Sequence, residues 1–202
     1  MTKPLLVGLT GGIGSGKTTV SHMFKVLGIP IYYADDRAKW IMVNDPELKL
    51  EICATFGEES YEPSGAINRA YLAQRVFNQP EELARLNGLV HPAVGRDFTN
   101  WVAENKEAPY LIKEAALIFE AGSYKTLDKV ITVTAPKAER LNRVILRDSQ
   151  RSKQQIEAIM DKQLSERERK KRSDFVVSND GKELVIPQVV ALDKQLRALA
   201  GQ

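Results

Sequence analysis

The sequence has 202 residues, enough for one compact domain with a large core and small insertions. Its 29 basic and 26 acidic side chains give a net charge of +3, too balanced to indicate binding to nucleic acid or to an anionic membrane. With Cys53 as the single cysteine, an intrachain disulfide is excluded. No stretch approaches the ~20 apolar residues that span a bilayer, so we expect a cytoplasmic protein.

Apolar runs along the chain predict strands, and apolar stripes at helical spacing predict helices between them. The nearly unbroken apolar run at residues 4–10 is typical of a strand buried on both faces of a parallel sheet. A helix is expected at residues 16–27, and Gly28 ends it. Further strands are expected at residues 29–33, 109–113, 129–134 and 175–178, and an amphipathic helix at residues 183–199.

Two helical blocks interrupt this alternation. Residues 35–106 contain no convincing strand, and residues 137–172, here called the charged segment, are expected to be helical. The first block is punctuated by Pro46, a turn at residues 62–65, Pro80 and Pro92. Strands alternating with helices predict a three-layer α/β/α fold with a parallel five-stranded sheet. Both blocks would then be insertions at the carboxyl edge of that sheet, where open α/β sheets bind ligands.

Residues 11–18 read Gly-Gly-Ile-Gly-Ser-Gly-Lys-Thr and match G-x-x-x-x-G-K-[ST] in full, between a strand and a helix. Glycines let consecutive backbone N–H groups turn toward one anion, and the helix adds the partial positive charge of its N-terminus. Lys17 would reach the β- and γ-phosphates, and the Thr18 hydroxyl would ligate Mg²⁺. The motif predicts a bound nucleoside triphosphate, but alone it does not separate kinases, GTPases and ATP-driven machines.

Other residues favour a small kinase, which needs a base near the acceptor and arginines over the phosphates. The GTPase strings N-K-x-D and D-x-x-G do not occur. Asp35 follows the second strand. The spacing alone favours two roles equally: a base or magnesium ligand, and a cap for a helix that starts near Arg37. Glu114 follows the strand at 109–113. At this position its carboxylate could bind a water molecule of a magnesium ion. From the sequence alone, however, a surface or capping role is favoured.

Arg140, Arg143 and Arg147 lie at i, i+3 and i+7 and share one helical face. A charged helix usually presents such a face to solvent. Beside a phosphate loop, however, the same face would suit a lid that brings guanidinium groups to the transferring phosphoryl and excludes water. His91 lies before Pro92 in an apolar context, which favours a buried, hydrogen-bonded histidine over a metal ligand.

In their order and spacing, these segments resemble the dephospho-coenzyme A kinase family along nearly the whole chain. The matching segments are residues 9–19, 33–35, 65–69, 76–77, 86–87, 91–92, 114–120, 143–148 with Gln163, and 173–179. The resemblance implies a P-loop kinase that transfers the ATP γ-phosphoryl to the ribose 3′-hydroxyl of dephospho-coenzyme A. It divides the chain into a nucleotide-binding core (1–34, 107–136 and 173–202), an acceptor-binding domain (35–106) and a lid (137–172).

The resemblance also implies roles for individual residues. Asp35 becomes the base or acceptor-orienting carboxylate, and Lys17, Arg143 and Arg147 act with it in catalysis. The implied ATP-binding residues are Gly12, Ile13, Gly14, Ser15, Gly16, Lys17, Thr18, Thr19 and Asn179. Arg69 and His91 would bind the acceptor with Asp35. Mg²⁺ would be held by Thr18, with Asp35 and Glu114 as candidates acting through water.

Three positions depart from the family pattern: Tyr33 stands for Asp, Glu114 for Asp, and Ala116 for Pro. None of these departures falls on Lys17, Thr18 or Asp35, although the surroundings of the magnesium ion would differ. The expected partners are ATP and dephospho-coenzyme A. A monomer is expected, with weak oligomerisation as the alternative. The competing functions are a nucleoside or nucleotide kinase and a non-catalytic nucleotide-binding regulator.

Overall fold

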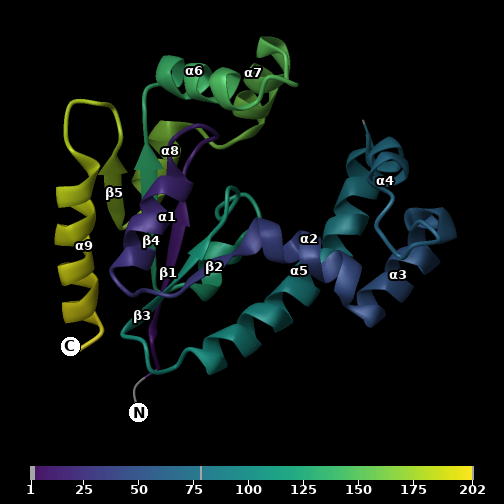
Figure 1. The fold of residues 1–202 in the computed structure, drawn as a ribbon, viewed down its shortest axis with the longest axis horizontal. Helices are drawn as coiled ribbons and strands as arrows, with labels where there is room; N and C mark the ends of the chain where they lie inside the picture. The colour runs from purple at the N-terminus through teal and green to yellow at the C-terminus, as the bar shows by residue number, and fades with distance from the viewer. Residues whose placement is uncertain (1–2, 78, 202) are drawn as a thin grey trace. The chain divides into compact units, whose positions relative to one another are not determined.

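The computed structural model describes residues 3–77 and 79–201, and its sheet has five parallel strands in the order β2-β3-β1-β4-β5 (Figure 1). The strands are β1 (Leu5–Thr10), β2 (Ile31–Tyr33), β3 (Tyr110–Glu114), β4 (Lys129–Thr134) and β5 (Phe175–Ser178). Burial of their apolar side chains explains why these runs form strands rather than loops. All five predicted strands are confirmed.

Helices cover both faces of the sheet. On one face α1 (Lys17–Val26) and α9 (Val185–Leu199) pack side by side, and their buried Phe24 and Leu192 join Ile131 of β4 in one apolar core. Because side chains alternate along a strand, Thr132 points to the opposite face. There its hydroxyl lies 2.6 Å from that of Ser173, which directly follows α8 (Glu166–Arg172). The predicted three-layer arrangement is confirmed.

A buried polar network ties β3 to α9. The Tyr110 hydroxyl donates to Asp193 Oδ1 at 2.6 Å, and Arg197 Nε donates to Asp193 Oδ2 at 2.9 Å. Burial, and then the hydrogen bond to Asp193, raises the pKa of Tyr110 well above its usual range. Each buried polar group in this network therefore has a partner, as a buried hydroxyl and a buried carboxylate require.

We expect Tyr110→Phe to lower the free energy of unfolding by about 1–2 kcal/mol, because it removes this bond while keeping the packed ring. Urea unfolding measures the change. Tyr124→Phe is the matched control, since Tyr124 lies in the short 3₁₀ helix η2 (Ser123–Thr126) and is 37% exposed. Equal losses in the two variants would contradict a stabilising role for the bond.

Residues Ala34–Glu104 form a second compact unit, distinct from the unit of Met1–Tyr33 and Asn105–Gln202. Its helices are α2 (Ala34–Asn44), α3 (Pro46–Phe56), the 3₁₀ helix η1 (Glu58–Ser60), α4 (Arg69–Val76) and α5 (Pro80–Glu104). Two tyrosine hydroxyls join its segments: Tyr61 donates to Met42 O of α2, and Tyr71 of α4 donates to Phe56 O of α3, each at 2.6 Å. The expected turn is present, with Gly65 N donating to Glu62 O.

Pro92 does not separate two helices, contrary to the prediction, because it lies inside α5. A proline within a helix removes one backbone hydrogen bond. The rest of α5 offsets this loss by burying Val90, Ala93, Val94 and Phe98, which flank the proline on both sides. Tertiary packing thus overrides the local preference of the proline.

The charged segment is divided into α6 (Lys137–Arg147), α7 (Lys153–Lys162) and α8. Serine side chains set the breaks between them. Ser152 caps α7 in a capping box with Gln155, and Ser165 caps α8 by accepting from Glu168 N. The backbone turns at each of these two breaks. As a result α8 packs against β4 of the sheet, while α6 and α7 lie beside the phosphate loop.

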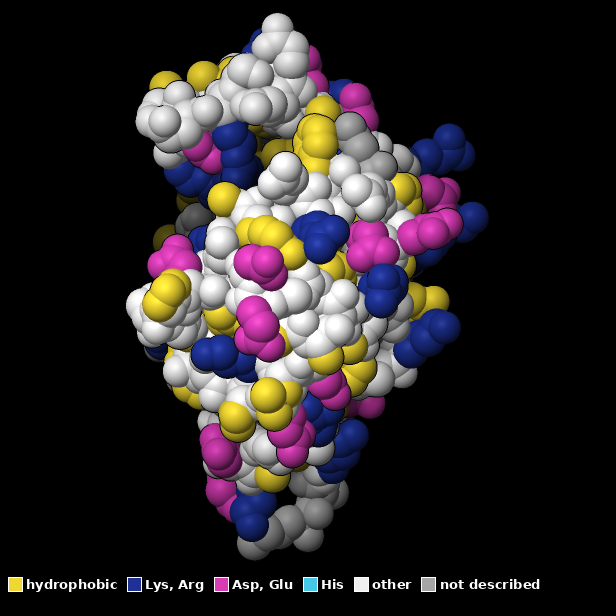
Figure 2. Space-filling view, turned by 90° about the vertical axis from the view of Figure 1, so that its right-hand side faces the viewer, with side chains coloured by type: hydrophobic (Ala, Val, Ile, Leu, Met, Phe, Trp, Pro, Cys, Tyr) yellow, Lys and Arg dark blue, Asp and Glu magenta, His cyan; other side chains and the backbone are white. Residues whose placement is uncertain are grey.

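The surface carries charges of both signs. In the view of Figure 2, acidic and basic side chains are interspersed with apolar ones, and no region of one sign dominates that face. None of the helices within residues 3–77 and 79–201 combines the length and the apolar character that crossing a membrane requires.

Candidate active site

The phosphate loop leaves β1 at Thr10 and enters α1 at Lys17. Gly14 and Gly16 have φ angles of 79° and 98°, which side chains with a Cβ rarely tolerate. Ser15 N donates to Gly12 O at 3.0 Å and closes the turn. This backbone leads directly into the helix N-terminus, the arrangement that binds phosphate.

Neighbouring groups lie close against three glycines of the loop. A Cβ on Gly12 would overlap Nη1 of Arg140, one on Gly14 would overlap the Arg140 backbone, and one on Gly16 would overlap the Asn179 amide. The loop is therefore enclosed by α6 and by the end of β5. Within the loop itself, the Ser15 hydroxyl is buried and lacks a hydrogen-bond partner among residues 3–77 and 79–201.

Lys17 and Glu114 form an ion pair, with Lys17 Nζ at 3.7 Å from Glu114 Oε1. Their side chains are 13% and 11% exposed, so water screens the pair weakly. Glu114 is the last residue of β3, and it lies beside Leu9 of β1 and Tyr33 of β2 in the register. The interpretation of Glu114 as a surface acid is therefore wrong, because the carboxyl ends of three strands enclose it.

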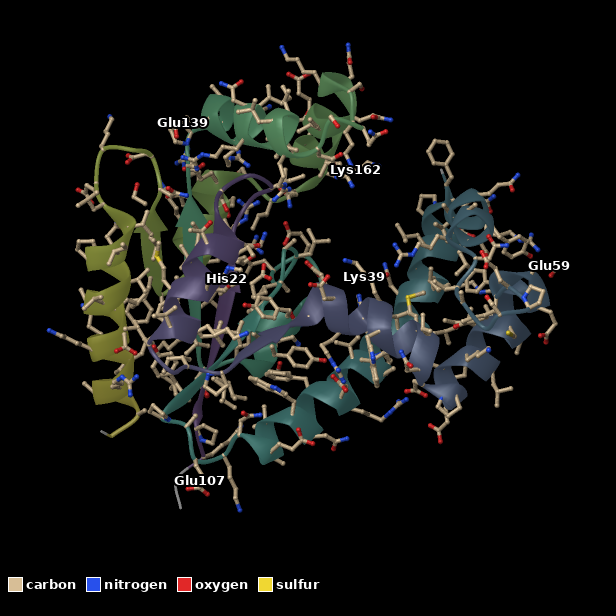
Figure 3. All side chains as sticks on the ribbon, in the orientation of Figure 1. His22, Lys39, Glu59, Glu107, Glu139 and Lys162 are labelled. Atoms are coloured by element: carbon tan, nitrogen blue, oxygen red, sulfur yellow. The ribbon has the colours of Figure 1, made fainter. Side chains whose placement is uncertain are left out.

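Asp35 lies in the first turn of α2, which begins at Ala34, three residues before the expected start near Arg37. Asp35 is therefore a residue of the helix itself and not its N-cap, and its side chain is exposed. A negative charge in the first turn stabilises the helix through the partial positive charge of the N-terminus. Asp36 in the same turn pairs with Lys39, labelled in Figure 3, at 2.8 Å. The role of Asp35 as a base stays a prediction.

Arg143, Arg147 and Asn179 occupy different environments. Arg143 donates to Glu139, labelled on α6 in Figure 3, and to Asn179 O, each at 3.0 Å. Arg147 is exposed near the end of α6. The Asn179 amide donates to Ser15 O at 2.8 Å, so it supports the phosphate loop from the end of β5. Arg143 and Asn179 therefore meet beside the loop.

The remaining predicted residues are exposed: Thr18 and Thr19 in the first turn of α1, Arg69 at the start of α4, and His91 on α5. The expectation of a buried His91 is wrong, because the apolar face of α5 is formed by other residues. An exposed hydroxyl at Thr18, beside Lys17 on the loop, fits a magnesium ligand.

Three further residues lie at the loop, and of these Arg169 was not singled out from the sequence. Gln163 Oε1, just beyond α7, accepts a hydrogen bond from Ile13 N at 2.9 Å. Arg140 and Arg169 reach Gly12 from α6 and α8. Arg140 shares the predicted helical face, but Arg169 stands in a run of charged residues without any distinguishing period.

Comparison with known proteins decides the family. The model of the family described as dephospho-CoA kinase matches residues 5–184. The chain belongs to the dephospho-CoA kinase family. A dephospho-CoA kinase of Salinibacter ruber is 41% identical over 177 residues, covering 87% of this chain and 88% of the relative. The family uses ATP, and its activity is the phosphorylation of dephospho-CoA in coenzyme A biosynthesis.

Solved structures agree with this family. A protein of Thermus thermophilus is 33% identical with a TM-score of 0.83, covering 98% of this chain and 99% of that one. A dephospho-CoA kinase from Campylobacter jejuni is 26% identical with a TM-score of 0.69, covering 96% and 97%. The predicted family and P-loop kinase fold are confirmed, and the protein is an ATP-dependent kinase with an alcohol acceptor.

Proposed function

We propose that this chain transfers the γ-phosphoryl of ATP to the ribose 3′-hydroxyl of dephospho-CoA, giving CoA and ADP. The observation that carries the proposal is the complete phosphate loop, with Lys17 held at 3.7 Å from Glu114, in a chain that matches the dephospho-CoA kinase family over residues 5–184. Lys17 is the cation that neutralises charge on the β- and γ-phosphates, and the loop amides orient them.

The proposed roles of the other residues follow from the chemistry of phosphoryl transfer. Asp35 accepts the proton of the acceptor hydroxyl or orients that hydroxyl. Thr18 would ligate Mg²⁺, and Asp35 and Glu114 are the candidates that would hold the ion through water. The ion would neutralise charge on the phosphate oxygens. Residues 12–19 and Asn179 bind ATP, and Arg143 and Arg147 contribute to transfer from the charged segment, which we propose is the lid.

We further propose that residues 35–106 bind the acceptor, through Arg69 and His91 together with Asp35. The exposed guanidinium group of Arg69 can bind a phosphate of dephospho-CoA, and the exposed imidazole of His91 can donate or accept a hydrogen bond. The proposed location is the cytoplasm, with ATP and dephospho-CoA as partners. The proposed state is a monomer, and a weak oligomer is the alternative.

The experiment that tests this function incubates the protein with Mg-ATP and a panel of acceptors: dephospho-CoA, adenosine and nucleoside monophosphates. We expect ADP release to depend on dephospho-CoA, with a kcat/KM at least about 100-fold above that for the other acceptors, because a site built for the longer molecule binds it at more points. Transfer to a nucleoside monophosphate without transfer to dephospho-CoA would refute the proposal.

A further inference from the structure

Two buried arginines from different helices converge on the phosphate loop. Arg140 on α6 is 9% exposed and Arg169 on α8 is 2% exposed. A Cβ placed on Gly12 would overlap Nη1 of Arg140 and lie 3.3 Å from Nη1 of Arg169. The two guanidinium groups therefore lie against the same residue of the loop.

A backbone carbonyl accepts a hydrogen bond from each of the two guanidinium groups. Arg140 Nε donates to Ala135 O at 3.1 Å, and Arg169 Nη2 donates to Leu164 O at 2.5 Å. The peptide that carries Leu164 is itself held, since Leu164 N donates to Glu120 Oε1 at 2.8 Å. These bonds use Nε of Arg140 and Nη2 of Arg169, while the Nη1 atom of each guanidinium group lies beside Gly12.

Neither arginine forms a direct ion pair in the part of the chain that the structure describes, although Glu120 and Glu166 lie close enough to stabilise the charge of Arg169. Within residues 3–77 and 79–201, the nearby carboxylates are engaged elsewhere: Glu166 pairs with Lys170 at 3.2 Å, and Glu120 accepts from Leu164. The Arg169 Nε atom is buried without a hydrogen-bond partner in that part of the chain. Burial lowers the pKa of Arg169, and although Glu120 and Glu166 oppose the shift, the neighbouring Arg140 adds to it.

A pair of buried cations without a directly paired counter-ion is costly, because each loses hydration and repels the other. An anion between them would offset both effects. The anion that the phosphate loop receives is the triphosphate of the nucleotide, whose terminal groups lie along Lys17 and the loop amides. Gly12 belongs to that loop, so an anion bound there reaches both arginines.

We propose that Arg140 and Arg169 contact the γ-phosphoryl group and are catalytic residues of this kinase. In the transfer, the acceptor oxygen bonds to the γ-phosphorus while the bond to the β–γ bridging oxygen breaks, and the acceptor proton passes to a base. Negative charge spreads over the phosphoryl oxygens and the leaving ADP. Two fixed guanidinium groups stabilise that charge without having to reorganise.

The proposal rests on the proposed use of ATP as donor but not on the acceptor, so binding measurements test it independently of dephospho-CoA. Calorimetry would compare the affinities of Arg140→Gln and Arg169→Gln for ADP and for a non-hydrolysable ATP analogue. We expect affinity for the analogue to fall by about 10- to 100-fold, as the loss of a charge-assisted hydrogen bond predicts, and affinity for ADP by less than about threefold.

Turnover supplies the second readout. We expect kcat with ATP to fall by about 10²–10³-fold in each variant, as for other removed donors to a transition state. Arg172→Gln is the matched control, because Arg172 lies on α8 with its side chain 48% exposed and pairs with Glu168. It should keep both affinities and kcat.

Equal losses of affinity for ADP and for the analogue, or no loss of either, would overturn the assignment to the γ-phosphoryl. Thermal melting without nucleotide separates these outcomes from unfolding. If a glutamine variant does not fold, the corresponding lysine variant, Arg140→Lys or Arg169→Lys, takes its place in the same comparison. The lysine variants keep the buried positive charge. Lysine lacks the planar fork of donors, so the selective loss of analogue affinity should persist in these variants.

Discussion

Asp35→Asn is expected to lower kcat for phosphorylation of dephospho-CoA by about 10²–10⁴-fold, while the Kd for ATP changes by less than about threefold. The substitution keeps the size of the side chain and removes its ability to take a proton. Asp35 lies in the first turn of α2, exposed to solvent, so its loss leaves no buried cavity. Steady-state kinetics would give kcat, and calorimetry would give the ATP affinity.

Asp36→Asn is the control for this experiment. Asp36 lies in the same first turn of α2, and its side chain is 76% exposed and pairs with Lys39. Both substitutions remove one negative charge from the helix N-terminus, so any effect on the helix should be common to the two variants. Parallel falls in kcat and ATP affinity for Asp35→Asn would show that Asp35 maintains the fold and does not take part in the chemistry.

Lys17→Met is expected to reduce kcat by about 10²–10³-fold and to weaken ATP binding as well, because Lys17 contacts phosphates in both the ground state and the transition state. The substitution also leaves the mostly buried Glu114 carboxylate without this cation, and that carboxylate would then repel the phosphates. Steady-state kinetics and calorimetry measure the two effects. Lys25→Met, in the exposed last turn of α1, is the control.

A double variant separates the two consequences of losing Lys17. Lys17→Met combined with Glu114→Gln also removes the negative charge that paired with Lys17, so thermal stability should return toward that of the unaltered protein. Turnover should remain low, because the cation at the phosphates is still missing. Recovery of kcat in the double variant would show that Lys17 serves only to neutralise Glu114.

Local chemistry made most of the sheet and the loop predictable. Strands β1 and β4 are rich in branched apolar residues and threonine, most of which the parallel sheet buries on both faces. The end of α1 was equally predictable, since Gly28 takes a φ of 84° that other residues rarely adopt. The glycine-rich motif placed Lys17 at the start of a helix, as the structure confirms.

Features that depend on distant parts of the chain were not predictable. The burial of Arg169 arises because α8 packs on β4, and nothing within the charged segment distinguishes it from the exposed Arg172. Likewise, the bond from Ile13 to Gln163 joins residues 150 positions apart. Glu114 was mistaken for a surface acid because its burial comes from the neighbouring strands β1 and β2.

The most direct test of the central claim follows the phosphoryl group itself. The protein would be incubated with dephospho-CoA and Mg-ATP labelled in the γ-phosphoryl group, and the product would be located by mass spectrometry and phosphorus NMR. We predict one labelled phosphate on the ribose 3′-oxygen of CoA for each ADP formed. Labelled inorganic phosphate with unchanged dephospho-CoA, or label at another position, would contradict the assignment of this chain as a dephospho-CoA kinase.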